Sequence, residues 1–284
     1  MSACPTAAEV AGRLGLPRSR RGYRGRCPVC GNDALEVRSV EGHLRAVCFY
    51  GCAPDELRRA VGGEHLAAAV AHAARPGPSD AERTAAALVV WNGAVAAHPA
   101  LTAYCAARSL PGLERSPALR WRPDVRHPEE RGLHPAVVGL VVDVLGRPLG
   151  VHRTYTRRDG SGKADLRPPK ASKGPTEGGA IRLDPAGPEL LIGEGIESSA
   201  AAGRLLGLPA WAGINAGNIE RSLALPPEVR RVVVAADPDP AGLRGADGAA
   251  RRWAAEWRTV RIIVPDLPGQ DFADLHAAQS AEAV

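Results

Sequence analysis

The chain has 284 residues, of which 45% are hydrophobic, and a formal net charge of +5. This length and apolar content support a globular protein with an ordinary core. They argue against an integral membrane protein, because no apolar run approaches the ~20 residues that span a bilayer, and no signal peptide is recognisable. We therefore expect a cytoplasmic protein without membrane contact, and the modest positive charge suits an anionic partner.

Residues 1–60 hold five of the six cysteines, and four of these have metal-ligand spacing. Cys27 and Cys30 form C-x-x-C, and Cys48 and Cys52 form C-x-x-x-C after seventeen intervening residues. Four thiolates in two such knuckles can enclose Zn²⁺, and the β-rich segment between them predicts the hairpin of a zinc ribbon. The alternative, a pair of disulfides, is disfavoured in a cytoplasmic protein. Four protein ligands leave no open position, so this zinc would serve structure or recognition.

Basic and flexible segments flank this cluster. Residues 61–84 comprise an Ala-rich helix followed by a linker, ARPGPSD, whose Pro, Gly and Ser content is typical of a domain boundary. The arginines before the first knuckle suit contacts with phosphate groups. They are Arg18, Arg20, Arg21, Arg24 and Arg26.

The middle region, residues 85–184, is predicted to mix a helix with a β-hairpin. A helix is expected over residues 85–108. The apolar and β-branched runs VVGLVVDV and LGVHRTYT are expected to pair across the turn at residues 146–148.

The last hundred residues alternate strand and helix, which predicts an α/β fold with a parallel sheet flanked by helices. Strands are expected at LLIG, PAWAG, RVVVAAD and VRIIVP, with helices near residues 197–206, 218–223, 241–257 and 272–278. The first turn, Gly193-Glu194-Gly195, lacks the third glycine of a dinucleotide-binding loop, and no acid follows about 20 residues on at a strand end. Glu194 itself is therefore the feature that needs explanation.

Acidic residues follow three of these strands. Asp237 and Asp239 lie at the end of the strand in RVVVAADPDPAG, where residues two apart on an extended chain face the same side. Asp271 follows VRIIVP, with Asp274 close behind, and Glu194 follows LLIG. Parallel strands bring their carboxyl ends to one edge, and clustered carboxylates suit Mg²⁺ or Mn²⁺. The alternative for Asp239 and the Asp271 pair is that they cap the helices that follow.

This combination resembles the topoisomerase-primase (Toprim) catalytic domain: Glu-Gly after one strand, Asp-x-Asp followed by Ala-Gly242 after another, and a final acidic pair. With the zinc ribbon and basic region before it, the chain resembles DNA primases of bacteria, phages and mobile elements over residues 25–278. The resemblance implies a Rossmann-like Toprim sheet, preceded by a mixed α+β basic subdomain and an N-terminal zinc ribbon. The predicted domains are residues 1–60, 61–84 (helix and linker), 85–184 and 185–284.

The resemblance also implies roles for individual residues. Glu194 would act as general acid or base, and Asp237, Asp239 and Asp271 would hold Mg²⁺. Arg153 and Lys170 would bind phosphates of the template or nucleotide. They belong to a basic stretch, broken by Gly and Pro, that is expected to form a loop along a nucleic-acid groove: Arg153, Arg157, Arg158, Lys163, Lys170 and Lys173.

The implied activity is synthesis of short RNA primers on single-stranded DNA from ribonucleoside triphosphates. Two alternatives remain open: a Toprim nuclease that cleaves DNA with the same metals, and a non-catalytic zinc-ribbon DNA-binding module. The replicative enzyme of bacteria usually carries Asp four residues after the Glu, where this chain has Ser198 with Glu197 beside it. No G-x-x-x-x-G-K-[ST] motif occurs, so a replicative helicase is expected to be a separate partner.

Overall fold

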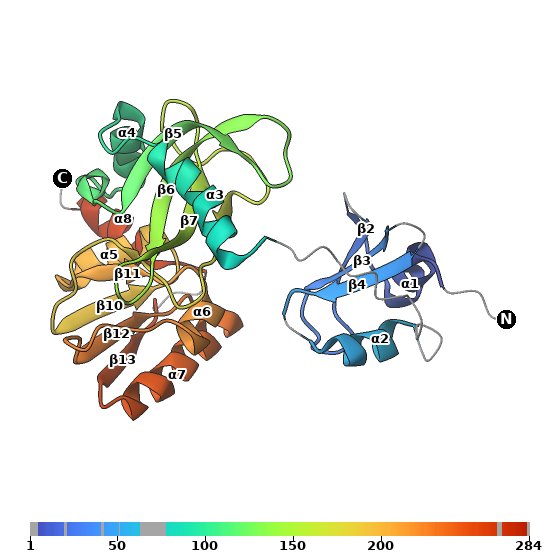
Figure 1. Ribbon diagram of the computed structural model, residues 1–284. Coiled ribbons are helices and arrows are strands. Elements are labelled where there is room, and N and C mark those ends of the chain that lie inside the picture. The colour runs from blue at the N-terminus through green and yellow to red at the C-terminus, as the bar shows by residue number, and fades with distance from the viewer. Residues whose placement is uncertain are drawn as a thin grey trace. The chain divides into compact units, whose positions relative to one another are not determined.

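A computed structural model describes residues 5–19, 22–40, 43–50, 52–62, 78–265 and 269–282 (Figure 1). The chain divides into two compact units, residues 1–77 and 78–284. The predicted Ala-rich helix and linker fall largely on residues 63–77, outside the described part of the chain. Among the helices that are described, none is long and apolar enough to cross a membrane.

The first unit is a four-stranded antiparallel sheet with two helices. The strands β1 (Arg18–Ser19), β2 (Gly22–Gly25), β3 (Leu35–Val40) and β4 (His43–Cys48) pair in chain order. Helix α1 (Ala7–Leu14) begins with a capping box between Thr6 and Glu9, and α2 (Pro54–Gly62) follows the second knuckle. The predicted hairpin between the knuckles is confirmed as β3 and β4.

The second unit begins with helices and a second antiparallel sheet. Helix α3 (Asp80–Asn92), helix α4 (Pro99–Ala107) and the short 3-10 helix η2 (Leu113–Arg115) precede the strands β5 (Leu119–Arg126), β6 (Leu133–Val142), β7 (Pro148–Tyr155) and β8 (Lys170–Lys173). These strands pair in chain order, so the predicted β6–β7 hairpin is confirmed. Strands β5 and β8 were not predicted.

The prediction of one helix over residues 85–108 is wrong. The chain leaves α3 at Gly93 and starts again at Pro99, with the His98 ring accepting a hydrogen bond from the Ala100 amide. Proline lacks an amide hydrogen and fits only the first turn of a helix, so Pro99 marks a start rather than an interior position.

The third sheet has the order β13-β12-β10-β11-β9. Strands β10 (Glu189–Gly193), β11 (Ala210–Ala212), β12 (Arg231–Ala235) and β13 (Thr259–Ile263) are mutually parallel, as predicted. The unpredicted β9 (Ile181–Arg182) adds an antiparallel edge. Helices α5 (Ile196–Leu206), α6 (Ala216–Arg221), α7 (Pro240–Ala255) and α8 (Phe272–Glu282) confirm the predicted alternation.

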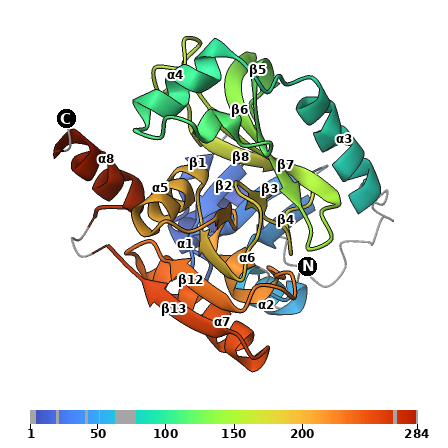
Figure 2. The same ribbon diagram turned by 90° about the vertical axis from the view of Figure 1, so that its left-hand side faces the viewer.

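Alternate residues of these strands serve two cores, as the strand period requires. Leu191 and Val233 pack with Ala201 of α5 and Phe272 of α8, whereas neighbouring strand residues pack with Trp253 of α7. The first of these cores also takes in side chains of α4, β5 and β6. The antiparallel and parallel sheets of the second unit thus share one hydrophobic core, and Figures 1 and 2 show them on opposite sides of α5.

Candidate functional site: a cysteine cluster and an acidic strand edge

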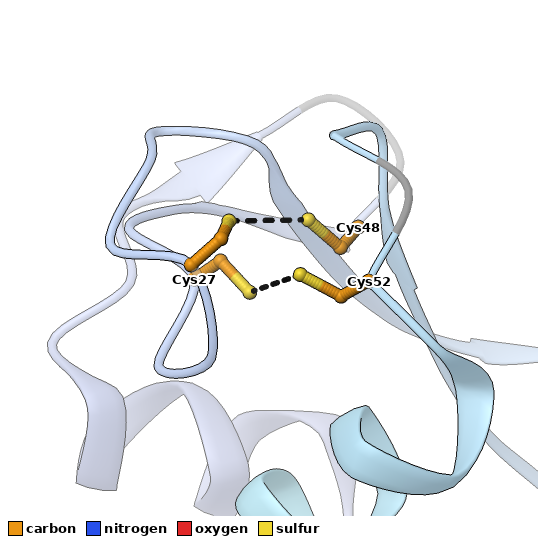
Figure 3. A group of neighbouring side chains, drawn as sticks. Cys27, Cys48 and Cys52 are labelled. Carbon is orange, nitrogen blue, oxygen red and sulfur yellow. Dashed lines mark hydrogen bonds between the residues drawn. The ribbon is translucent and has the colours of Figure 1, made fainter.

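The four predicted cysteines converge in the first unit. The Sγ atoms of Cys27 and Cys52 lie 3.9 Å apart, and those of Cys30 and Cys48 lie 3.7 Å apart (Figure 3). Four sulfur ligands at the usual Zn–S distance of ~2.3 Å form a tetrahedron with edges of ~3.8 Å, whereas a disulfide joins sulfurs at ~2.05 Å. All four thiols are free, so the spacing is that of a tetrathiolate metal site.

The electrostatics around Cys30 also favour metal binding. A hydrogen bond from the Asn32 backbone lowers the pKa of Cys30 to about 6, whereas burial raises the pKa of Cys27 and of Cys52. The thiolate is the form of cysteine that binds metals, and a lowered pKa increases its population near neutral pH. The residues present therefore fit a zinc ion held by four thiolates.

Two exposed aromatic rings lie within the second knuckle, directly after Cys48, and were not singled out from the sequence. Phe49 is 59% exposed and Tyr50 is 57% exposed. The guanidinium carbon of Arg24 lies 5.2 Å from the centre of the Phe49 ring. Exposed aromatic rings beside cationic groups are the usual contact surface for bases of single-stranded nucleic acids. In the sequence, the signal that could have indicated this surface was a pair of aromatic residues directly after Cys48, a predicted zinc ligand. Of the arginines predicted to contact phosphate, Arg20 and Arg21 lie outside the described residues.

The carboxyl ends of β10 and β12 bring Glu194 and Asp237 together, as predicted. The strands are neighbours with Gly193 opposite Ala235, and Glu194 follows Gly193 directly. Adjacent strands lie ~4.8 Å apart, so residues just past paired strand ends are close in space. The amide of Ile214 donates a 2.9 Å hydrogen bond to the Glu194 carbonyl, which fixes the turn that presents the side chain.

Gly242 explains why helix α7 can start so close to Asp237. A Cβ atom at position 242 would lie 2.5 Å from the Asp237 carbonyl oxygen. Only a residue without a side chain permits this approach, which gives the Ala-Gly that follows Asp-x-Asp a physical reason.

Asp239, Asp271 and Asp274 cap the helices that follow them, as the alternative interpretation of these acids held. One carboxylate oxygen of Asp239 accepts hydrogen bonds from the amides of Ala241 and Gly242, both at 2.8 Å. Asp271 and Asp274 exchange amide-to-carboxylate hydrogen bonds of 3.1 and 2.9 Å at the start of α8. The second oxygen of Asp271 accepts a 3.4 Å hydrogen bond from Ser198, which places Asp271 beside the first turn of α5.

Negative charge is crowded at this edge. Burial, reinforced by the charges of Asp237 and Asp239, raises the pKa of Glu194 to about 7. Burial and the charges of Asp271 and Asp239 likewise raise the pKa of Asp237. Oδ1 of Asp237 is buried and accepts no hydrogen bond from the residues that the structure describes. A buried carboxylate oxygen without a donor, surrounded by other acids, fits coordination of a hard divalent cation.

The carboxylates do not form a closed coordination shell. In the described part of the chain, the four cysteines are the only group of three or more potential ligands whose atoms all lie within 4.8 Å of one another. Mg²⁺ usually keeps several water ligands and takes only one or two carboxylates, so an open acidic edge is compatible with its chemistry.

Lys170 and Lys163 lie close to the acidic edge and meet at a buried carboxylate. Lys170 Nζ donates a 3.0 Å hydrogen bond to Glu197, and a Cβ atom on Gly195 would lie 3.4 Å from the same Nζ. Lys163 Nζ lies 3.5 Å from Glu197. The positive charge of Lys170 opposes the rise of the Asp237 pKa, which stays raised by burial and by the neighbouring acids. Glu197 received no role in the sequence analysis, because nothing local indicates that its side chain is buried.

The predicted basic stretch is only partly a loop. Arg157 and Arg158 are exposed on the loop between β7 and β8, as expected of nucleic-acid contacts. Lys170 and Lys173 instead lie in strand β8. Arg153 is only 6% exposed, and it donates hydrogen bonds of 2.8–3.1 Å to the carbonyls of Arg126, Ala171 and Ser172. This geometry favours a structural role for Arg153 over the predicted phosphate contact.

Comparison with known proteins identifies two segments. Residues 81–183 match a domain of unknown function (DUF7146), and residues 189–282 match the Toprim domain family. No curated protein matches the chain.

Three solved structures are similar to the chain at low identity. The E. coli primase catalytic core is 17% identical, covering 66% of this chain and 73% of its own, with a TM-score of 0.42. The primase fragment of the bacteriophage T7 primase-helicase protein is 15% identical, covering 92% and 96%, with a TM-score of 0.43. The zinc-binding and RNA polymerase domains of the Aquifex aeolicus primase are 15% identical, covering 96% and 81%, with a TM-score of 0.48.

The family match and the geometry agree on the C-terminal third. The matched segment contains the parallel strands, Glu194, the Asp-x-Asp pair and the final acidic pair. Residues 189–282 of this chain are a Toprim domain.

Proposed function

We propose that the chain is a DNA primase, which synthesises short RNA primers on single-stranded DNA by metal-dependent nucleotidyl transfer. The observation that carries this proposal is the acidic edge of the Toprim domain, where Glu194 and the under-bonded Asp237 lie side by side with Lys170 close by. An edge of this kind provides both metal-binding oxygens and a cation for a triphosphate.

The residues of this edge divide the chemistry between them. Asp237, with Asp239 and Asp271 through their second oxygens, would hold Mg²⁺ or Mn²⁺. The metal, when bound, supplies neutralisation of the charge that develops on the triphosphate during in-line attack by a 3′-hydroxyl. Glu194, with its pKa near 7, is suited to accept the proton of that hydroxyl. Lys170 would contact the phosphates of the ribonucleoside triphosphate.

The first unit would bind the template. Four thiolates with tetrahedral spacing would hold Zn²⁺ in a closed structural site, and this site would fix the loop that carries Phe49 and Tyr50. Bases of single-stranded DNA would stack on these rings while Arg24 contacts phosphate. Arg157 and Arg158 would guide the strand in the second unit. A separate helicase as the source of that strand remains a prediction from sequence.

A primer-synthesis assay tests this function. The full-length protein, with zinc bound, is incubated with single-stranded DNA, ribonucleotides and Mg²⁺ or Mn²⁺. We expect new oligoribonucleotides, and a loss of about 100-fold or more in Asp237→Asn, because the main metal-binding oxygen is removed. The matched control is Asp247→Asn, an exposed acid on α7 that lies outside the acidic edge.

Two results would contradict the proposal. Fragments of template that require metal and Asp237 would identify a nuclease instead. DNA binding without any metal-dependent product, unchanged in Glu194→Gln and Asp237→Asn, would leave a non-catalytic binding module.

A further inference from the structure

Glu197 is a buried acid beside the acidic edge. The residue is 3% exposed and lies in the first turn of α5, three residues after Glu194. Oε1 accepts a 2.5 Å hydrogen bond from Tyr104 Oη, and Oε2 accepts a 3.0 Å hydrogen bond from Lys170 Nζ. Lys163 Nζ lies 3.5 Å from Oε1. The carboxylate is therefore enclosed by three groups from different segments.

Charge at this cluster is unbalanced in favour of the lysines. One carboxylate faces two ammonium groups, so the three side chains carry a formal charge of +1. Both lysine side chains are 31% exposed, whereas that of Glu197 is 4% exposed. Each ammonium group has three N–H donors. Lys170 gives one of them to the carboxylate, and Lys163 faces the carboxylate as an ion pair. Among the described residues neither ammonium group makes a further hydrogen bond, so the other donors can face an anion.

This positive charge lies beside the acidic edge. Lys170 Nζ lies against Gly195, the residue after Glu194, and its charge acts on Asp237. An anion that contacts both lysines and also a cation held by the acids would need several negative charges, as a nucleoside triphosphate has. Burying such a carboxylate is a poor way to add stability, because the desolvation cost offsets much of the attraction. Holding the two ammonium groups in one geometry is the better explanation.

We propose that Glu197 is a positioning residue that holds Lys170 and Lys163 against the acidic edge to receive the triphosphate of the incoming nucleotide. This inference rests on the proposed function. Glu197 does not touch the nucleotide and acts through the lysines. Without its charge, the two ammonium groups repel each other and leave the edge.

Steady-state primer synthesis and direct nucleotide binding test this role. Glu197→Gln keeps the size of the side chain and an acceptor for Tyr104 but removes the charge. We expect the KM for ribonucleotides, and the Kd for an ATP–Mg²⁺ complex measured by calorimetry, to rise roughly 10- to 100-fold, since small displacements of positioning groups have effects of this size. Glu197→Asp restores the charge and should recover part of both losses.

Two controls separate positioning from folding. Glu189→Gln makes the same change at the opposite end of β10, where the acid pairs with Arg231 on the surface, and should leave KM and Kd unchanged. Tyr104→Phe removes one buried hydrogen bond without changing charge and should lower thermal stability more than nucleotide affinity. If Glu197→Gln does not fold, Glu197→Gln/Lys163→Gln keeps the formal charge of +1 and is compared with Lys163→Gln alone.

The outcomes distinguish this inference from the proposed function. Primer synthesis by the wild type with unchanged KM and Kd in a folded Glu197→Gln overturns the positioning role and leaves the primase proposal standing. If the wild type makes no primer, the primase proposal fails, and the Kd comparison alone decides whether Glu197 supports a triphosphate site.

Discussion

At the scale of single residues, Glu194 links pH to stability. Its pKa is about 7 instead of the ordinary 4.5, so the folded chain keeps this proton between those values while the unfolded chain loses it. The metal-free fold must therefore lose stability as pH rises through this window. Glu194→Gln should stabilise it by about 1–2 kcal/mol at pH 8 and very little at pH 4.5, after allowance for partial exposure. Urea unfolding without added divalent cations measures this, and equal effects at both pH values would contradict it.

We expect Arg153 to have a structural role and Arg158 to bind DNA. Arg153→Ala removes hydrogen bonds to three carbonyls, of which that of Arg126 keeps a second donor, Tyr155, and should reduce the unfolding free energy by about 2–4 kcal/mol. Arg158→Ala changes an exposed side chain and should leave stability within ~0.5 kcal/mol while weakening single-stranded DNA binding and its salt dependence. Thermal melts and binding titrations at two salt concentrations check both. A weaker DNA affinity with normal stability in Arg153→Ala would restore the predicted phosphate contact.

At the scale of structural elements, the start of α7 determines where Asp237 lies. Gly242→Ala places a methyl group against the Asp237 carbonyl, so the helix or the strand end must shift. We expect a loss of about 1–3 kcal/mol in stability together with weaker Mn²⁺ binding, measured by paramagnetic relaxation. Gly12→Ala is the matched control: position 12 lies on α1 with open space around it, and the substitution should stabilise that helix by about 0.5–1 kcal/mol.

The loop after β4 is a separate element with its own test. Phe49→Ala and Tyr50→Ala should each weaken single-stranded DNA binding by about 1–3 kcal/mol without lowering thermal stability, because both rings are already in water. Trp257→Ala serves as control: this ring is 93% exposed but precedes β13, at the end of the Toprim strands opposite Glu194. An equal loss of affinity in the control would indicate nonspecific contact with exposed aromatics.

At the scale of the whole molecule, two units with separate hydrophobic cores should respond separately to metal removal. A zinc chelator should unfold the small first unit, whose core is too limited to compensate for the lost thiolate site. Residues 78–284 should keep their own melting transition. Calorimetry with and without chelator, alongside zinc content by mass spectrometry, measures this. A single transition that shifts as a whole would show that the units fold together.

Much of the site was accessible from sequence because its signals are local. The cysteine spacing predicts the knuckles, and the alternation of strand and helix places Glu194 and Asp237 beyond neighbouring strand ends. The same local patterns predicted that Asp239 and Asp271 could be caps or metal ligands. Each caps its helix through one oxygen, and the second oxygen of Asp271 also accepts a long hydrogen bond from Ser198. The prediction of one continuous helix through Pro99 was wrong, because the chain ends one helix before this proline and starts another at it.

What the sequence by itself determined was the chemistry of each segment: a four-thiolate cluster, acids at parallel strand ends, and a Toprim order of elements. Tertiary structure alone decided that Glu197 is buried between Lys170 and Tyr104, which lie 27 and 93 residues away in the chain. It also decided that Arg153 is enclosed by β5 and β8 and that β9 adds an antiparallel edge. The physical reason is that burial and long-range pairing depend on how separate elements pack, and residue spacing along the chain carries no record of that packing.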